Sequence, residues 1–191
     1  MSTIFVTGGA GFIGSAFVRL LLERDEATQV TNFDALTYAG NLDNLEGLDQ
    51  TRHRFVRGDI SNRAAVLAAL DEDTDAIINF AAESHVDRSI LSADEFLRTN
   101  IIGTQVLLDV ARERGVRRFL QVSTDEVMGS LPDDEASYFT ETSPFAPNSP
   151  YAASKAAAEH LVAQLQPAPR QRRRKRADLR RPHQRRSSSI R

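Results

Sequence analysis

The chain has 191 residues, of which 41% are hydrophobic, and this length suffices for one domain with a buried core. It contains no cysteine, which excludes disulfides and thiolate metal sites, and no apolar run approaches the length needed to cross a membrane. The net charge of −2 hides two different regions: residues 170–191 carry eleven basic side chains and one acid, whereas residues 1–169 carry 13 basic and 25 acidic ones. The start of the chain lacks the features of a signal peptide, so we expect a cytoplasmic protein.

The first predicted strand, over residues 3–7, leads directly into a glycine-rich turn. Gly8, Gly11 and Gly14 follow it, and an apolar helical pattern begins at Ile13. Strand, glycine turn and helix form the context in which a glycine fingerprint binds a dinucleotide, because glycine lets the backbone approach a pyrophosphate. The free N–H groups at the start of the helix then face the phosphates.

The second predicted strand, over residues 29–33, ends at Asp34, twenty positions after Gly14. An acid at this spacing is typical of dinucleotide sites, where it accepts hydrogen bonds from the adenosine ribose hydroxyls. A carboxylate would repel the 2′-phosphate of NADP, so the pattern predicts NAD as the cofactor.

The rest of the pattern alternates strands and helices, which predicts a doubly wound α/β fold with a Rossmann-type parallel sheet. Ligands of such sheets bind at the carboxyl ends of the strands, where five segments of this chain should meet in one crevice. A surface loop is expected over residues 130–150. Further strands are predicted over residues 53–57, 75–80 and 118–122, and helices over 62–71, with Ser61 as the N-cap, 93–114 and 151–165.

Two groups of side chains could perform chemistry beside a nicotinamide. Tyr151 and Lys155 form Y-x-x-x-K, which places both on one face of the last helix, and a lysine cation there should lower the pKa of the phenol. Thr124, Asp125 and Glu126 place one hydroxyl and two carboxyl groups at the mouth of the crevice, where the carboxyls could serve as general acid and general base.

The glycine turn and Y-x-x-x-K resemble the extended short-chain dehydrogenase/reductases. Within that superfamily, the chain resembles the dTDP-glucose 4,6-dehydratase family over residues 1 to about 165. The segments that carry this likeness are LTYAGN at 36–41, AAESHVDRS at 81–89 and STDEV at 123–127. Met128 departs from the family, which usually has tyrosine at this position.

The resemblance implies a redox-neutral lyase reaction, in which dTDP-glucose is dehydrated to dTDP-4-keto-6-deoxyglucose with bound NAD. Tyr151 would take the proton from the C4 hydroxyl as hydride passes from C4 to the nicotinamide, and Thr124 would polarise the C4 oxygen. Glu126 would remove the C5 proton, and Asp125 would protonate the departing C6 hydroxyl. The hydride then returns to C6. Lys155 would also bind the nicotinamide ribose.

The resemblance also assigns contacts to the cofactor and the substrate. Ser84 and Thr124 correspond to substrate contacts, and we read His85 as a residue that structures its loop. No metal site is proposed. We expect a homodimer, and neither nucleic acid nor a membrane as a partner. The residues that correspond to NAD contacts are Gly8, Gly11, Phe12, Ile13, Gly14, Asp34, Ala35, Leu36, Thr37, Asp59, Ile60, Ala81, Ala82, Thr99, Tyr151 and Lys155.

The end of the chain does not resemble this family, which continues with further strands and a smaller domain that holds the substrate's nucleotide. We therefore expect an NAD-binding domain over residues 1–166 with an incomplete sheet. A disordered Arg/Pro-rich tail should follow over residues 167–191. This tail is either a phosphate-binding arm or, as the abrupt loss of pattern favours, an out-of-frame reading of a GC-rich gene.

Three functions remain open at this point. The first is the dehydratase, with this chain expected to be an inactive fragment. The second is an NAD-dependent sugar-nucleotide 4-epimerase, although epimerases usually place small hydroxyl residues where Asp125 and Glu126 stand. The third is an NAD-binding module without catalysis.

Overall fold

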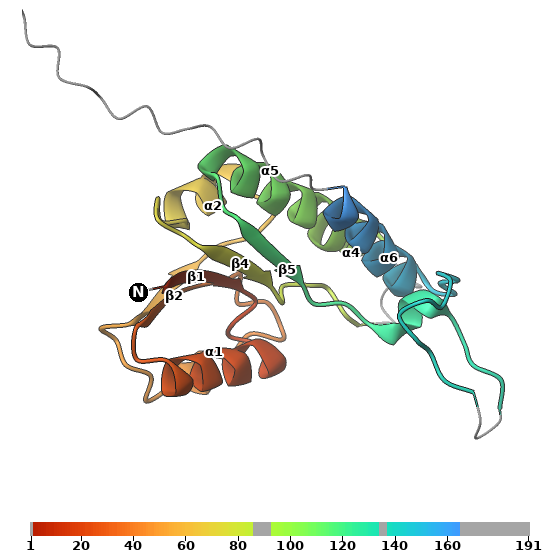
Figure 1. Cartoon of the computed structure of the whole chain (residues 1–191), viewed down its shortest axis with the longest axis horizontal. Coiled ribbons are helices and arrows are strands. Elements are labelled where there is room, and N and C mark those ends of the chain that lie inside the picture. The colour runs from red at the N-terminus through yellow and green to blue at the C-terminus, as the bar shows by residue number, and fades with distance from the viewer. Residues whose placement is uncertain (1, 86–92, 134–136, 165–191) are drawn as a thin grey trace, which may run out of the picture.

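The computed structural model describes residues 2–85, 93–133 and 137–164, which form a parallel sheet with helices on both faces (Figure 1). The tail expected over residues 167–191 lies outside the described residues, as do residues 86–89 of the segment 81–89.

Five parallel strands make up the sheet in the order β3-β2-β1-β4-β5. The chain moves outward from the central strand to one edge, then returns to the centre and moves outward to the other edge. This confirms the predicted doubly wound fold and places the reversal of strand order between β1 and β4, where such sheets bind ligands. The strands are β1 (Ser2–Thr7), β2 (Thr28–Asp34), β3 (His53–Arg57), β4 (Ala76–Asn79) and β5 (Arg118–Gln121).

The helices lie on opposite faces of this sheet. Figure 1 shows α1 (Phe12–Arg24) on one side and α2 (Arg63–Ala69), α5 (Thr104–Arg114) and α6 (Pro150–Ala163) on the other. The short α4 (Asp94–Phe96) and a π-helical stretch (Leu97–Gly103) run directly into α5.

Each face of the sheet buries its own apolar core, because successive strand side chains point to opposite faces. Phe5 belongs to the core under α2 and α5, where it clusters with Val66 and Leu107. Val6, the next residue of β1, belongs to the core under α1, where it clusters with Val18. All five side chains are fully buried.

Two predicted helices differ in detail from the structure. The helix expected over residues 93–114 contains the π-helical stretch Leu97–Gly103, and π-turns of this kind often accompany functional sites. The widened turns include Asn100, whose side chain is buried and bonds to the neighbouring loop. The predicted N-cap Ser61 is wrong, because Asn62 caps α2 by accepting a hydrogen bond from the Ala65 N–H (3.2 Å).

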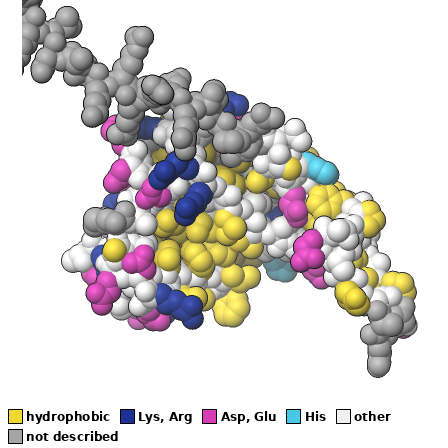
Figure 2. Space-filling view, viewed as in Figure 1, with side chains coloured by type: hydrophobic (Ala, Val, Ile, Leu, Met, Phe, Trp, Pro, Cys, Tyr) yellow, Lys and Arg dark blue, Asp and Glu magenta, His cyan; other side chains and the backbone are white. Residues whose placement is uncertain are grey.

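Apolar side chains gather between α1 and β5 on the face shown in Figure 2. The exposed large hydrophobic residues of these two elements are Leu120 of β5 and Phe12, Ile13 and Leu20 of α1. In the described part of the chain, β5 pairs with β4 alone and is an edge strand. Among the described residues, no helix is both long and apolar enough to span a bilayer.

The two cores provide a test of the packing. Leu107→Ala on α5 should lower the free energy of unfolding by about 2–5 kcal/mol, because Leu107 is fully buried and truncation leaves a cavity. Leu20→Ala on α1 makes the same chemical change at a side chain that is 46% exposed, and it should cost about 0.5 kcal/mol or less. Urea denaturation measures both values, and equal losses would contradict the burial described here.

Candidate functional site

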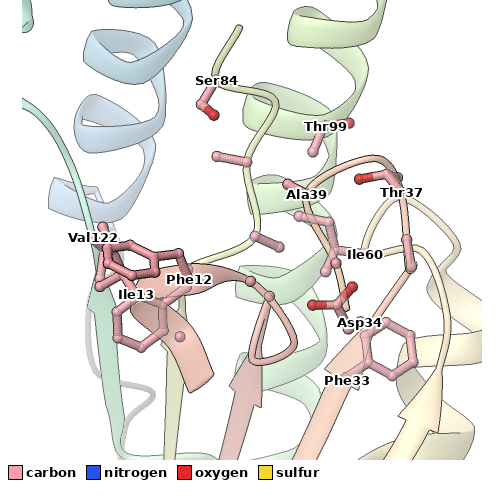
Figure 3. Close-up of a pocket in the computed structure, with 18 of the residues that line it drawn as sticks. Phe12, Ile13, Phe33, Asp34, Thr37, Ala39, Ile60, Ser84, Thr99 and Val122 are labelled. Carbon is pink, nitrogen blue, oxygen red and sulfur yellow. The ribbon is translucent and has the colours of Figure 1, made fainter. Parts of the chain in front are cut away.

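A cavity of about 380 Å³ lies at the carboxyl ends of the strands (Figure 3). Its walls come from the turn after β1 and from the segments that follow β2, β3, β4 and β5, which confirms the predicted convergence of five segments. The π-helical stretch contributes Thr99, and α6 contributes Tyr151 and Lys155. The other predicted cofactor and substrate residues that line it are Gly8, Gly11, Phe12, Ile13, Gly14, Asp34, Ala35, Thr37, Asp59, Ile60, Ala81, Ala82 and Ser84.

The turn after β1 requires glycine at two positions. Gly8 has a φ of +69°, and a Cβ there would lie 2.5 Å from the backbone nitrogen of Ala81. A Cβ on Gly14 would lie 2.2 Å from the carbonyl oxygen of Gly8. Glycine therefore lets α1 start close against the strand ends, at the edge of the cavity.

The start of α1 offers hydrogen-bond donors to this cavity. The first helical bond runs from the Ser15 N–H to the Gly11 carbonyl (3.0 Å), so the N–H groups of Phe12, Ile13 and Gly14 have no carbonyl within the helix to bind. These donors stand at the positive end of the helix dipole, which suits a pyrophosphate. In Figure 3, Phe12 and Ile13 lie beside Val122 at one side of the cavity.

Asp34 lies at the end of β2 and is 8% exposed. Its Oδ2 accepts a hydrogen bond from the Ala10 N–H (2.9 Å), and its Oδ1 accepts one from the Leu36 N–H (2.8 Å). Each carboxylate oxygen keeps a further lone pair, so Asp34 can also accept from ribose hydroxyls. Figure 3 shows the carboxylate beneath Ile60 and the loop that carries Thr37.

Leu36 is the predicted cofactor residue that is absent from the cavity lining. It adopts a φ of +53°, and its side chain packs with the apolar core under α1. Its N–H group is held by Asp34, so the residue fixes the path of the loop.

A hydrogen bond joins two of the loops that form the cavity wall, the loop after β2 and the loop after β4. The phenol of Tyr38, on the loop after β2, donates to Glu83 Oε1 on the loop after β4 (2.7 Å). Asn100 in turn binds the backbone N–H and the backbone carbonyl of Glu83, each at 2.9 Å, and donates to the Ser154 hydroxyl of α6 (2.9 Å). The backbone N–H of His85 also donates to Glu83 Oε1 (3.3 Å), in keeping with its expected role in structuring this loop.

Lys155 and Tyr151 sit at the end of the cavity nearest β5. Lys155 is 4% exposed, and its Nζ donates to the Val122 carbonyl (2.5 Å). Burial lowers the pKa of Lys155 to about 8. Burial raises the pKa of Tyr151, and the Glu126 carboxylate adds to this rise, whereas a hydrogen bond with Thr124 opposes it.

The prediction that Lys155 lowers the phenol pKa is wrong for this structure. The Tyr151 pKa is raised, because partial burial outweighs the opposing influences on its phenol. The Lys155 ammonium is engaged by the Val122 carbonyl. The two side chains share the cavity wall, as the Y-x-x-x-K spacing predicted.

Thr124, Asp125 and Glu126 lie outside the cavity lining, next to Tyr151. Thr124 Oγ1 accepts a hydrogen bond from the Glu126 N–H (3.3 Å) and thereby caps the 3₁₀ turn Asp125–Met128. The carboxylates of both acids act on the Tyr151 phenol. The structure therefore places the two carboxyls near enough to Tyr151 to influence its phenol, while Tyr151 itself lines the cavity.

Sequence reasoning missed part of the cavity wall. The missed residues are Phe33, Ala39, Gly40, Gly58, Phe80 and Val122. Most of them adjoin a predicted site residue at a strand end, and that position was the available signal.

An anion-binding helix start, a ribose acceptor at Asp34 and a cation at Lys155 line one elongated cavity, and together they fit a dinucleotide.

Comparison with known proteins agrees with this geometry. Residues 5–170 match the family model for GDP-mannose 4,6 dehydratase. The chain is 57% identical over 160 residues to the low-salt glycan biosynthesis protein Agl12 of Haloferax volcanii, covering 83% of this chain and 50% of that protein. It is 53% identical over 173 residues to the dTDP-glucose 4,6-dehydratase of Xanthomonas campestris, covering 85% and 48%.

A solved structure shows the same likeness in three dimensions. The dTDP-glucose 4,6-dehydratase DesIV of Streptomyces venezuelae, solved with NAD bound, matches with a TM-score of 0.77 and 51% identity, covering 83% of this chain and 50% of that one. The chain spans about half the length of the curated relatives it matches.

The raised pKa of Tyr151 predicts a pH dependence. The unfolded chain releases this phenolic proton near pH 10, and the folded chain releases it at higher pH, so folding stability should fall as the pH rises above 10. Tyr151→Phe should remove phenolate absorbance that appears above pH 10 and leave the titration below pH 10 unchanged. If Tyr151→Phe instead removed an ionisation below pH 10, the Tyr151 phenol would have a lowered pKa, as first expected from Lys155.

Proposed function

Since the chain belongs to the GDP-mannose 4,6 dehydratase family, we propose that it carries the cofactor site and catalytic groups of a dTDP-glucose 4,6-dehydratase. Relatives that are 51–53% identical and are named for that activity support dTDP-glucose as the substrate. The observation that carries the proposal is made at Tyr151, which lines the cavity and whose phenol feels the charges of the Asp125 and Glu126 carboxylates. These two acids favour a dehydratase over an epimerase.

Residues on the cavity wall would hold NAD, which supplies a hydride acceptor and donor when bound. The free N–H groups at the start of α1 bind its pyrophosphate, and Asp34 accepts hydrogen bonds from the adenosine ribose. Lys155 binds the nicotinamide ribose at the far end, next to Tyr151. Ile60 and Asp59 lie where the adenine is expected.

The chain's own groups would move three protons at the sugar. Tyr151 takes the proton of the C4 hydroxyl, and Thr124 polarises the C4 oxygen. The resulting 4-keto group acidifies C5–H, whose proton passes to Glu126, while Asp125 gives a proton to the C6 oxygen. The C5–H electron pair becomes the C5–C6 double bond, and the C6–O bond breaks to release water.

The position of these groups supports that division of work. Glu126 and Asp125 lie on one short turn, and the charges of both act on the Tyr151 phenol, so acid, base and phenol belong to one site. Ser84, on the loop after β4, lies on the cavity wall in reach of a substrate. We also keep a homodimer, a cytoplasmic location and an NAD-binding domain over residues 1–166 as proposals, which rest on the resemblance.

Cofactor choice tests the proposal in the chain itself. NAD should bind at least about tenfold more tightly than NADP, because the Asp34 carboxylate accepts from a ribose hydroxyl and repels a 2′-phosphate. Calorimetric titration with each dinucleotide measures both affinities. Asp34→Asn removes the charge and keeps one side-chain oxygen, so it should reduce the preference. Equal affinities in the unaltered chain would exclude this role for Asp34.

The reaction is tested in a fusion that joins residues 1–164 to the remaining half of the Xanthomonas relative. The fusion should release the 4-keto-6-deoxy product, and Glu126→Gln should slow that release about 10²–10⁴-fold with the NAD affinity unchanged. Deuterium uptake from solvent at C5 should fall in the same variant. Glu23→Gln, at an exposed glutamate of α1, serves as the matched control. Normal release by Glu126→Gln would remove Glu126 from the mechanism.

A further inference from the structure

A second acid on α6, Glu159, lies one helical turn beyond Lys155 and has no part in the proposed reaction. Its carboxylate accepts a hydrogen bond from the hydroxyl of Ser123. Ser123 lines the cavity directly after Val122, and Val122 is the residue whose carbonyl receives the Lys155 ammonium. Glu159 and Lys155 therefore contact the same two-residue segment from the same helix face.

This segment is tied on both sides. The N–H of Val122 donates to the carbonyl of Asn79, which extends the ladder between β5 and β4 by one residue (3.1 Å). The hydroxyl of Ser123 is bound to α6 through Glu159. The Val122 carbonyl lies between these two attachments, so its direction toward Lys155 is fixed by both.

We infer that Glu159 is a positioning residue that seats the Lys155 ammonium at the nicotinamide end of the cavity. It acts through Ser123, by holding the end of β5 against α6, and through its own negative charge. The inference deepens the proposed function and rests on it, because Lys155 is there assigned to the nicotinamide ribose. Glu159 itself does not line the cavity and needs no contact with cofactor or substrate.

The electrostatics of the site agree with this role. Burial of Lys155 lowers its pKa to about 8, and the charge of Glu159 opposes that fall. Other titratable groups on the surrounding elements are engaged elsewhere: Asp125 and Glu126 act on Tyr151, and Glu83 binds Tyr38. The Val122 carbonyl, which holds the ammonium, carries no charge. Glu159 thus helps to keep Lys155 protonated at neutral pH.

The effect of the Glu159 charge on the Lys155 pKa is tested by NMR in the full chain without cofactor. The sequence contains two lysines, Lys155 and Lys175, so labelling lysine with ¹³C at Cε yields two signals to follow with pH. Glu159→Gln keeps an oxygen for Ser123 and removes the charge, and it should lower the Lys155 pKa by about one unit. Glu23→Gln, on the opposite face of the sheet, should leave it in place.

Two results of this titration are informative beyond the expected one. An unchanged Lys155 pKa in Glu159→Gln would overturn the inference. Should the variant fail to fold, Lys155 would titrate as an exposed lysine near pH 10.4, a rise that cannot be confused with the expected fall. The second variant below then decides.

The hydrogen bond that holds the end of β5 against α6 is tested by Ser123→Ala, which removes the hydroxyl and keeps Glu159. Amide hydrogen exchange at Val122 should become about tenfold faster, as expected for the loss of one hydrogen bond, with exchange at Val30 in β2 unchanged. Unchanged exchange at Val122, or equal acceleration at both amides, would overturn the inference. Neither experiment needs NAD, so failure here is distinct from failure of the dinucleotide titration, which tests the proposed function.

Discussion

The structure depends most on the turn after β1, which leaves no room for a side chain at two of its positions. At Gly8 and Gly14, a Cβ would meet backbone atoms at 2.5 Å and 2.2 Å, so the chain can leave β1 and start α1 only with hydrogens there. The close approach sets the start of α1 over the reversal point of the sheet. It also brings the Ala10 N–H to Asp34, which links the turn to the end of β2. The anion-binding and ribose-binding ends of the cavity are therefore placed by one local constraint.

The opposite wall depends on buried polar contacts. Asn100 is 2% exposed and uses its side chain to hold the loop after β4 and to reach Ser154 of α6. Lys155, four residues after Tyr151, is tied to the end of β5. Buried polar groups are costly unless bonded, so a network whose members satisfy one another fixes a single arrangement of loop, strand end and helix. That arrangement places Tyr151 in the cavity wall, where the carboxylates of Asp125 and Glu126 influence its phenol.

Much of this was accessible from the sequence, because the signals were local. Apolar strands, the glycine spacing and Asp34 predicted the sheet and the cofactor end of the cavity. The π-helical stretch was hidden, since its apolar spacing also suits an α-helix. Asn62 and Ser61 are both good caps, and the choice between them depends on contacts. The Tyr151 pKa depends on burial and on charges from other segments of the chain. Leu36 was assigned to the cofactor by resemblance, and nothing in the local sequence shows that its side chain packs against the core.

We infer that the described residues of the chain form a cavity that binds a dinucleotide and is organised by the turn after β1. Mapping amide chemical shifts of the ¹⁵N-labelled chain on addition of NAD tests it most directly. We expect the largest changes at Phe12, Ile13 and Gly14, with further changes at Leu36, and none at the amino ends of the strands near Thr74. Saturating NAD that leaves the amides of the turn unmoved, or that moves those near Thr74 instead, would contradict it.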